Sequence, residues 1–440
     1  MLLIYLHKNS LRCSYIFDLI FKEEFGIEYH TTNDITQFRN YNEEKINYSD
    51  SKIGNEFFIK ASSFLWESEI KRQEIKVGEK EHVKILFPND DDLGFDIFSS
   101  AFYMLSRYEE YLYFTPDQYG RYKAADSLAF QNNFLEIPIV DNWIYILKNL
   151  LQKKFPSIKL KSSEFKAILT YDIDVAYKYR GRSLAITIGS AFKDLLAFKM
   201  KDILTRKKTL LKSQKDPWDV YDDLKESISK NKLNSIFFFL LADKTKHDRN
   251  LDYKNPLMKE LIHKIKSFSE IGIHPSFNSS SFPEKIVLEK ERLEDLSLEK
   301  LNKSRQHYLK FNLPGTYNSL IAAGITEDYS MSFPDMPGFR AGTSRPFYFY
   351  DLKNEKITRL KIFPITCMDA TFIYYTKKTP EKSLMAILNL LKEVKKVNGT
   401  FISIFHNDHL GEIENGKNWK SVHDKMILQI RSYLKINSLK

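Results

Sequence analysis

Short, wholly apolar segments alternate with longer amphipathic ones in the second part of the chain, and this alternation limits the fold more than any other feature. Residues 165–171 and 235–241, the latter reading SIFFFLL, are continuous apolar runs typical of strands buried on both faces of a sheet. Further strands and helices are expected at 271–273, 330–333, 362–364 and 401–405, and at 256–269, 283–311, 381–397 and 419–434. Strands alternating with helices predict a parallel sheet with crossover helices, so the fold class is α/β.

The first part of the chain predicts a smaller mixed α/β domain. Its expected strands and helices lie at 2–6, 56–61 and 83–87, and at 14–25, 96–113 and 142–153. A chain of 440 residues favours two domains, and the polar stretch 159–163 is the best boundary, giving 1–160 and 161–440. The run from Arg107 to Tyr111 could serve a site, but an exposed helix face or an ion pair between domains is the preferred interpretation.

Composition excludes several classes of protein. Hydrophobic residues make up 43% of the chain and aromatic residues 14%, which excludes a disordered chain. The net charge is +10, but most of the basic residues are interspersed with acidic ones along the chain. We therefore expect a solvated surface and no nucleic-acid partner.

Cys13 and Cys367 form no ligand motif, and two cysteines fit a reducing compartment, so a cytoplasmic location is expected. The apolar start is interpreted as a strand and a helix, not a signal peptide, and no stretch reaches the roughly 20 apolar residues of a bilayer-spanning helix.

One basic segment departs from the mixed charge pattern. Between Arg180 and Lys215, ten basic residues accompany only Asp194 and Asp202, with apolar residues at near-helical spacing. Such a segment commonly packs over a domain with its basic face in water. The alternative is a basic amphipathic helix that binds a polyanion or lies on an anionic membrane surface, here peripherally at the inner membrane.

Several expected strands end in polar side chains of catalytic type. Asp172 and Asp174 leave the first strand, two residues apart and therefore on the same side of it, and His274 leaves the third. His406 and His409 follow the last strand. In a parallel α/β barrel the active site assembles at the carboxyl ends of the strands, so these side chains are expected to converge. One carboxylate can then bind a cation with His274 while the other stays free as a base.

In order along the chain, these segments resemble the motifs of the polysaccharide deacetylase (NodB-like) carbohydrate esterases. The matching segments are Thr170–Tyr171–Asp172–Ile173–Asp174, His274, Arg340 with Pro346 and Phe347, Met368–Asp369–Ala370, and Ile404–Phe405–His406. The resemblance implies a distorted parallel (β/α)7-type barrel that removes an N-acetyl or O-acetyl group from a carbohydrate or glycan precursor. The Ser-Arg-Tyr-Glu-Glu-Tyr segment ending at Tyr111 is similar to one in uncharacterised Bacteroidetes-type deacetylase-like proteins.

The resemblance also implies a role for each matching residue. Asp172 would be the general base and His406 the general acid, with Arg340 orienting the first and Asp369 tuning the second. Asp174 and His274 would hold a divalent metal, with zinc expected and cobalt or manganese as alternatives. The candidate substrate contacts are Phe277, Thr343, Phe347 and His409.

The second metal motif departs from the family pattern. The family places a second histidine four residues after the first, and here that position is Asn278, with Ser279 beside it. An Asn oxygen holds zinc more weakly than an imidazole does. The coordination of the metal could be completed by Asn278, Ser279 or His409 with water, or the metal could be held loosely. Alternatively, the barrel could be a catalytically impaired carbohydrate-binding protein. The oligomeric state stays open.

Overall fold

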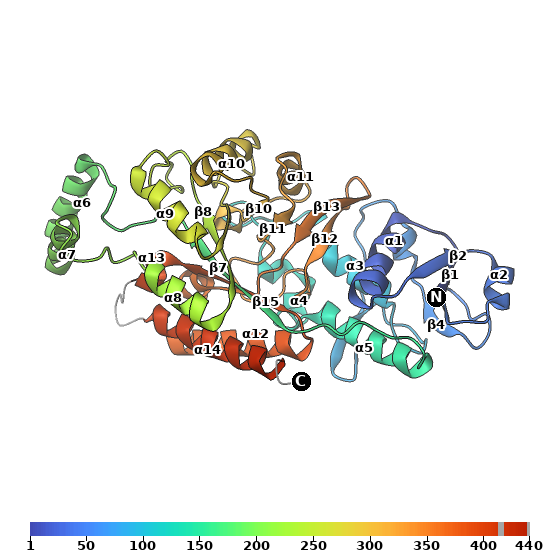
Figure 1. The fold of residues 1–440 in the computed structure, drawn as a ribbon. Helices are drawn as coiled ribbons and strands as arrows, with labels where there is room; N and C mark the ends of the chain where they lie inside the picture. Colours follow the sequence, from blue (N-terminus) through green and yellow to red (C-terminus); the bar gives the residue numbers. More distant parts are fainter. Residues whose placement is uncertain (412–417, 438–440) are drawn as a thin grey trace.

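The computed structural model describes residues 1–411 and 418–437, which form two α/β units placed end to end (Figure 1). The smaller unit contains the amino terminus, and the larger contains the strands whose ends carry the predicted site. The two units share one hydrophobic core cluster. Phe102 of the first unit and Tyr350 of the second, for example, have ring centroids 5.0 Å apart.

The smaller unit is built on a parallel sheet in the order β2-β1-β3-β4. Its strands are β1 (Leu2–Leu6), β2 (Tyr29–Thr32), β3 (Lys45–Ser49) and β4 (Phe57–Lys60), and a separate antiparallel pair is formed by β5 (Val77–Lys80) and β6 (Val83–Leu86). The main helices are α1 (Leu11–Phe17), α2 (Ile35–Asn40), α3 (Ile97–Leu105), α4 (Leu128–Gln131) and α5 (Ile139–Lys154). Helix α3 is buried along its whole length, and Asp96 caps it by accepting the Ser99 N–H at 3.0 Å.

A buried ion network joins the two units where the 96–113 helix was expected to continue. Helix α3 ends before Arg107, which has a left-handed φ of 54°. The Arg107 guanidinium lies 2.7 Å from both Glu109 and Glu110. Glu110 also accepts two hydrogen bonds from Arg340 of the larger unit, at 2.9 and 2.6 Å. Of the two alternatives for this run, the structure therefore has the ion pair between units.

The larger unit contains a nine-stranded sheet in the order β12-β13-β11-β10-β9-β8-β7-β15-β14. Its strands are β7 (Lys166–Ile173), β8 (Asn234–Phe239), β9 (Glu270–Ile273), β10 (Lys303–Ser304), β11 (Glu327–Asp328), β12 (Phe347–Asp351), β13 (Lys356–Ile362), β14 (Cys367–Met368) and β15 (Thr400–His406). All neighbouring strands are parallel except β12 and β13. Within the described residues, β12 and β14 do not pair with each other, so the sheet is open and the expected (β/α)7 barrel is not closed.

Helices surround this sheet (Figure 1). They are α8 (Tyr221–Asn231), α9 (Pro256–Lys266), α10 (Glu284–Ser297), α11 (Gly315–Ala322), α12 (Pro380–Lys396), α13 (Asn407–Gly411) and α14 (Trp419–Asn437). The centre of the sheet is tightly packed at Gly272 in β9, where an added Cβ would lie 2.6 Å from the Phe238 ring and 2.9 Å from the Lys303 carbonyl. Only glycine fits there, so β8, β9 and β10 approach closely and their ends converge.

One expected helix is wrong in its second half. The helix predicted over 283–311 ends at Ser297, where Leu298 takes a left-handed conformation with φ 59°. The chain then forms the short strand β10 and a 3-10 turn at His307–Leu309. The strand expected at 330–333 is also displaced, because pairing with β10 and β13 occurs at Glu327–Asp328 instead.

The basic segment after β7 forms two helices, α6 (Leu184–Leu196) and α7 (Met200–Leu210), which project away from the larger unit (Figure 1). Helix α6 contains no buried residue. The expectation that this segment packs over the sheet is therefore wrong. Across the described part of the chain, no helix has the length and apolar character needed to cross a membrane.

Candidate active site

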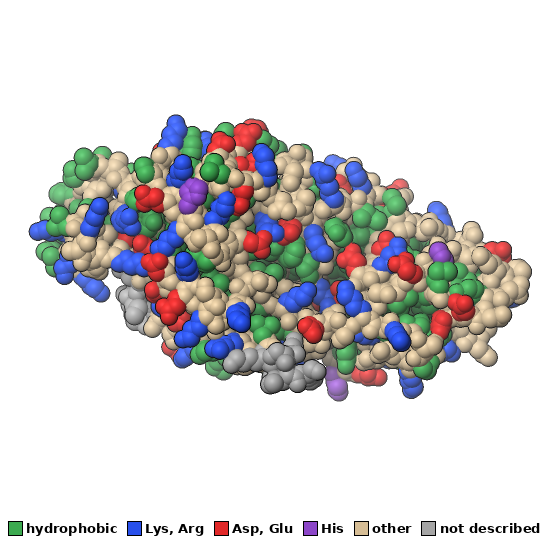
Figure 2. Space-filling model, in the orientation of Figure 1, with side chains coloured by type: hydrophobic (Ala, Val, Ile, Leu, Met, Phe, Trp, Pro, Cys, Tyr) green, Lys and Arg blue, Asp and Glu red, His purple; other side chains and the backbone are tan. Residues whose placement is uncertain are grey.

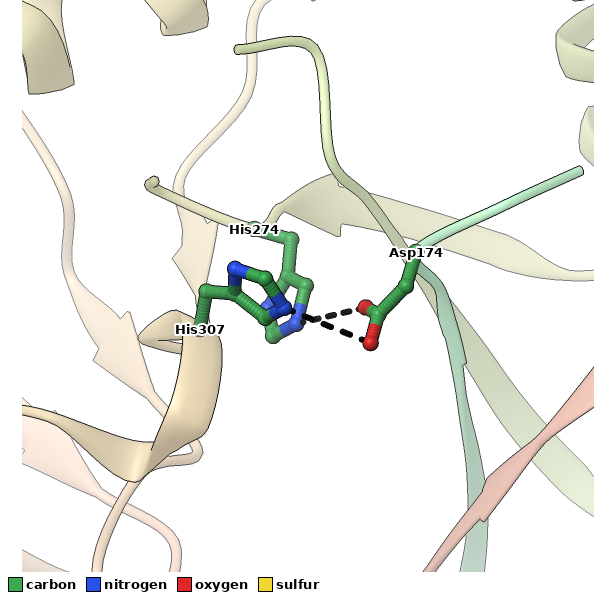
Figure 3. Close-up of side chains that lie close together, drawn as sticks. All are labelled: Asp174, His274 and His307. Atoms are coloured by element: carbon green, nitrogen blue, oxygen red, sulfur yellow. Dashed lines mark ion pairs between the residues drawn. The ribbon is translucent and has the colours of Figure 1, made fainter. Parts of the chain in front are cut away.

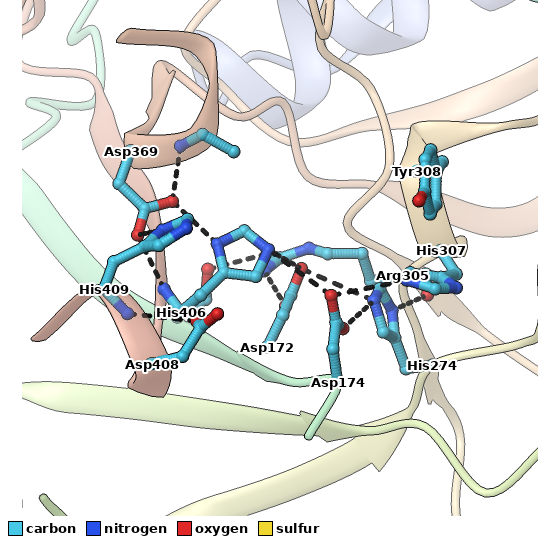
Figure 4. A network of polar contacts seen from close by, with 12 residues as sticks. Asp172, Asp174, His274, Arg305, His307, Tyr308, Asp369, His406, Asp408 and His409 are labelled. Atoms are coloured by element: carbon cyan, nitrogen blue, oxygen red, sulfur yellow. Dashed lines mark hydrogen bonds and ion pairs between the residues drawn. The ribbon is translucent and has the colours of Figure 1, made fainter. Parts of the chain in front are cut away.

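Six acidic and imidazole side chains meet at the carboxyl ends of neighbouring parallel strands (Figure 4). Asp172 and Asp174 come from the end of β7, and His406 is the last residue of β15, in register with Asp172. His274 directly follows β9, and Asp369 directly follows β14. The sixth side chain, His307, follows β10. Parallel pairing aligns these strand ends at one edge of the sheet, so residues as far apart in sequence as Asp172 and His406 become neighbours.

Asp174, His274 and His307 form a cluster in which each offers one ligand atom within 4.8 Å of the others (Figure 3). Asp174 Oδ1 lies 3.2 Å from His274 Nε2, and Asp174 Oδ2 lies 3.3 Å from His307 Nε2. The Oδ1 atom is buried and has no hydrogen-bond partner among the described residues. A buried carboxylate oxygen is costly without a partner, so this atom is one sign that the cluster suits a cation.

The outer nitrogens of both histidines are held by acceptors. His274 Nδ1 lies 2.6 Å from the carbonyl oxygen of Arg305, and His307 Nδ1 lies 2.9 Å from the carboxylate of Asp248. A carbonyl and a carboxylate only accept hydrogen bonds, so both Nδ1 atoms donate their hydrogen. In the neutral rings the lone pairs are therefore on the Nε2 atoms, which face Asp174, as in metal sites where a second layer of groups orients the ligands.

The acidic and imidazole groups of this cluster shift one another's pKa values. Desolvation raises the pKa of Asp174, but His307 and His274 outweigh it and hold the pKa well below its usual range. Burial lowers the pKa of His307, but Asp174 and Asp248 outweigh it and raise the pKa to about 9. When no cation is bound, the two carboxylates therefore stabilise the protonated form of the His307 ring. Two imidazoles and one carboxylate form a donor set typical of zinc and neighbouring transition metals.

Asp172 lies beside this cluster with one oxygen held and the other facing the site. Arg305 Nη1 donates to Asp172 Oδ1 at 2.7 Å, while its Nη2 donates to Thr170 Oγ1, also at 2.7 Å. The arginine is fully buried, and its guanidinium carbon lies 4.4 Å from the centroid of the Phe238 ring. Asp172 Oδ2 lies 3.7 Å from His274 Nε2 and 4.0 Å from His406 Nε2.

The structure corrects the role expected for Arg340. Its guanidinium binds Glu110 and donates to the Ser332 carbonyl at 2.9 Å, so it belongs to the contact between the two units. Arg305 is the arginine that contacts Asp172. The local sequence around Arg340 does not show which carboxylate it reaches, because Glu110 is 230 residues away.

His406 and His409 share the carboxylate of Asp369. His406 Nδ1 lies 2.7 Å from Oδ1, and His409 Nδ1 lies 2.8 Å from Oδ2. Burial lowers the pKa of each ring, but Asp369 outweighs it and raises His406 to about 10 and His409 to about 9. His406 Nε2 points toward the first cluster and lies 3.9 Å from Asp174 Oδ2. A protonated imidazole aimed at the site is the arrangement that a general acid requires.

The other predicted site residues lie in different places. The Ser279 hydroxyl donates to the Ser276 carbonyl at 2.6 Å and lies 3.0 Å from the Gln306 side chain. The Asn278 carbonyl accepts backbone hydrogen bonds from 281 and 282, so both residues stabilise the loop after β9. Among the acidic and imidazole side chains, His307 joins Asp174 and His274, whereas Ser279 and Asn278 make the loop contacts just described. Thr343 donates to Asp141 at 2.5 Å, which again joins the two units.

The two aromatic residues predicted to contact substrate, Phe347 and Phe277, lie in different surroundings. Phe347 is 1% exposed and belongs to the hydrophobic core, so it is not available to a substrate. Phe277 stacks on His247 with 4.0 Å between ring centroids. The centroid of the Tyr308 ring lies 5.2 Å from that of Phe277. Tyr119 of the smaller unit joins the same aromatic group, with its ring centroid 5.3 Å from that of Tyr308. Because Tyr308 directly follows His307, this group lies beside the metal cluster (Figure 4).

Arg305, His307 and Asp248 are the site residues that sequence analysis missed. The first two lie inside the segment 283–311 that was expected to be one helix. The spacing Arg305–x–His307 resembles that of Asp172–x–Asp174, and a helix of 29 residues without an interior stop signal is longer than usual, so both features were available as warnings. No motif marked Asp248.

Comparison with known proteins finds one family model that matches the first part of the chain and several solved structures with a distant likeness. A model of a family of unknown function, DUF7033, matches residues 2–156. The chain matches none of the curated proteins. A Mycobacterium smegmatis structure described as a polysaccharide deacetylase is 15% identical, with a TM-score of 0.41, 61% of this chain covered and 85% of that chain.

Two further solved structures are similar to this chain at a comparably low level. A polysaccharide deacetylase from Bacillus cereus is 12% identical, with a TM-score of 0.33 and coverages of 62% and 89%. A CE4 family pseudoenzyme from Bacillus anthracis is 10% identical, with a TM-score of 0.30 and coverages of 61% and 61%. Likeness at this level does not transfer an activity, and one of the three is a pseudoenzyme. This chain is thus similar in structure to two proteins described as polysaccharide deacetylases and to a CE4 family pseudoenzyme, and its residues 2–156 match the DUF7033 model.

Proposed function

We propose that this protein is a metal-dependent hydrolase that removes an N-acetyl group, or an O-acetyl group, from a carbohydrate or glycan precursor. One observation carries the proposal. A carboxylate held by a buried arginine, Asp172, and an imidazole held by a buried carboxylate, His406, flank the cluster of Asp174, His274 and His307. A base and an acid on either side of a cation site are the groups that amide or ester hydrolysis requires.

Asp174, His274 and His307 would hold the divalent cation, with zinc expected and cobalt or manganese as alternatives. When bound, the cation polarises the acyl carbonyl and makes a water molecule more acidic. Asp248 and the Arg305 carbonyl keep the two imidazoles turned toward Asp174. These residues supply the orientation that a cation site needs before the cation arrives.

Asp172 takes the proton of the attacking water through Oδ2, the oxygen that faces the site. Arg305 occupies the other oxygen and stabilises the ionised carboxylate, so it is a positioning residue. His406 then donates the Nε2 proton to the leaving amine or alcohol, while Asp369 holds the ring in place through Nδ1. The 4.0 Å between Asp172 Oδ2 and His406 Nε2 places base and acid close enough to act on one reacting group.

The aromatic group of Phe277, Tyr308 and Tyr119 would form the wall against which a sugar ring stacks. Tyr119 is partly exposed and comes from the smaller unit, so both units would contribute to substrate contact. Phe277, expected from sequence to touch the substrate, would support this wall from within, since it is 9% exposed and its ring stacks on His247. Phe347 lies in the hydrophobic core, and Thr343 lies in the contact between the two units.

A catalytically impaired carbohydrate-binding protein was the alternative, and its basis was the absence of a histidine at position 278. His307 now completes an Asp-His-His cluster from another strand. The substitution at Asn278 therefore no longer argues against hydrolysis.

The test measures metal content by elemental analysis and acetate release from an acetylated chito-oligosaccharide with added zinc, cobalt or manganese. We expect about one ion per chain and metal-dependent acetate release. Asp172→Asn should retain the metal and lose activity by about a hundredfold or more. Asp295→Asn, an exposed aspartate on α10, is the matched control and should behave as wild type. Equal rates for the two variants would remove Asp172 from the role of base, and a protein that holds metal but releases no acetate would support the binding alternative.

A further inference from the structure

The helical hairpin of α6 and α7 is exposed in a way that the proposed chemistry does not explain. It leaves the sheet after β7 and projects beyond the rest of the molecule at the left end of Figure 1. Large apolar side chains cover it, and the most exposed are Phe198 (89%), Leu184 (81%), Ile188 (68%), Leu211 (68%), Leu196 (65%) and Phe192 (60%). Figure 2 shows this end of the molecule as a mixture of hydrophobic and basic side chains.

The apolar side chains of α6 form a continuous stripe. Leu184, Ile188, Phe192 and Leu196 follow one another at intervals of four residues, so they lie along one face of the helix. All four are exposed. An apolar stripe is normally the face that a helix buries, and here no described part of the chain covers it.

The opposite, polar face of α6 is the one that packs against α7. Arg206 of α7 is 7% exposed and contacts Ser190 and Asp194 on α6. Thr187 accepts a further bond from Arg206 at 3.4 Å through its carbonyl. The hairpin thus holds its two helices together through polar contacts and turns its apolar stripe outward. This arrangement separates the stripe from both the hairpin interior and the sheet.

Lysines flank the apolar surface. The exposed lysines of the hairpin are Lys193, Lys199, Lys201, Lys207, Lys208 and Lys212. None of the six forms a salt bridge with a carboxylate of the described residues, and both hairpin acids are engaged elsewhere, Asp194 with Arg206 and Asp202 with Lys178. The surface therefore combines apolar side chains with uncompensated positive charge.

We propose that the hairpin 184–211 docks onto the surface of an anionic lipid bilayer, with its apolar stripe among the acyl chains and its lysines at the lipid headgroups. An interfacial helix needs this combination of an apolar face and flanking basic residues. A second copy of the chain fits less well, because two hairpins with the same positive charge would repel each other across their shared face. The proposal does not depend on the chemistry of the site.

The base of the hairpin couples such docking to the position of the site. The buried carboxylate of Asp216 accepts backbone hydrogen bonds from Lys178, Tyr179 and Arg180 on the outgoing segment, at 2.8, 2.9 and 3.1 Å. It also accepts the Trp218 N–H on the returning segment at 3.1 Å. Asp216 therefore joins both legs of the hairpin close to the end of β7, where Asp174 lies. Docking would thus tether the unit that carries the site to the bilayer.

The test is flotation of the full chain with vesicles of phosphatidylcholine alone or with added phosphatidylglycerol. We expect binding to the anionic vesicles at low salt, and release as ionic strength rises. The variant I188S/F192S/L196S/F198S should reduce the partition coefficient by about tenfold or more. Each Lys→Gln change among Lys193, Lys199, Lys201 and Lys207 should reduce it by roughly fivefold. All these side chains are exposed, so folding and acetate release from a soluble oligosaccharide should stay unchanged.

The matched control replaces exposed apolar residues outside the hairpin, Met385→Ser with Leu428→Ser, and should float as wild type does. The proposal is overturned if the wild-type chain stays with the protein fraction on anionic vesicles at low salt. Flotation of the hairpin variant at wild-type levels overturns it too. Light scattering of the lipid-free protein supplies a further check, since a dimer that the apolar variant dissociates would assign the surface to a second copy instead.

Discussion

Two clusters of the same composition, one aspartate and two histidines, lie side by side at the end of the sheet and differ in which ring nitrogen faces the carboxylate (Figure 4). In the first, His274 and His307 turn Nε2 toward Asp174, because acceptors outside the cluster hold their Nδ1 atoms. In the second, His406 and His409 turn Nδ1 toward Asp369.

The carboxylates differ accordingly. Asp369 also accepts the backbone N–H of His406 at 2.8 Å and of Ala370 at 2.6 Å, so both of its oxygens are satisfied by hydrogen bonds. Asp174 keeps a buried oxygen without such a bond. Both clusters have a composition that could hold a metal ion, but only the first keeps a buried carboxylate oxygen without a hydrogen bond, which favours it as the proposed cation site. Ring orientation, set by the surrounding acceptors, also differs between the two.

The largest effect should follow from removing an imidazole of the first cluster. His307→Ala should lose the bound metal and reduce acetate release by about a thousandfold or more, because the cation site falls to two ligands. Elemental analysis of the purified variant and an acetate assay measure both effects. His409→Ala is the matched change in the second cluster and should keep the metal. If His409→Ala lost the metal and His307→Ala kept it, the two clusters would have to exchange their roles.

Removing the acid should leave the cation site intact. His406→Ala should keep the wild-type metal content while kcat falls by about a hundredfold to a thousandfold, the range for loss of a general acid. His263, an exposed histidine on α9, supplies the His→Ala control. A metal-free His406→Ala protein would mean that the second cluster takes part in holding the cation.

A smaller effect is expected from the acceptor behind His307. Asp248→Asn removes the charge that receives the Nδ1 hydrogen, so the ring should be held less firmly and metal affinity should fall by about ten- to a hundredfold. Competition with a chelator of known affinity measures this change. The circular dichroism spectrum should stay that of wild type, and an unchanged affinity would show that Asp248 does not orient the ligand.

The smallest effect concerns pH. Burial lowers the pKa of His307, but Asp174 and Asp248 raise it to about 9 when no cation is bound. The ring is therefore protonated at neutral pH and must lose that proton to bind a metal. Uptake should release a proton at neutral pH, and apparent affinity should rise by about tenfold per pH unit until the pH passes the pKa.

Calorimetry in buffers of different ionisation enthalpy measures the released proton. His409 has a similarly raised pKa of about 9 but faces the other carboxylate, so His409→Ala should keep the same pH dependence. An affinity that does not change between neutral pH and the pKa of His307 would contradict the prediction.

Much of the site was predictable because its residues follow apolar strands. Asp172, Asp174, His274 and His406 directly end or follow short apolar segments that favour buried strands, and parallel pairing brings such ends together. Arg305 and His307 were not predictable in this way. Their strand, β10, has only two residues, and the polar sequence around it continues the helical pattern of α10 without a break that the sequence displays.

By itself, the sequence determined the α/β class, the central strands β7, β8, β9 and β15, and the strand-end carboxylates and histidines, since these follow from local apolar patterns and the geometry of parallel pairing. Only the tertiary structure decided that Arg305 and not Arg340 holds Asp172, and that His307 takes the place expected for Asn278. It also decided that the sheet stays open and that the apolar stripe of α6 faces outward. Partners hundreds of residues apart meet through packing, and no local pattern records which charge a buried arginine or imidazole will reach.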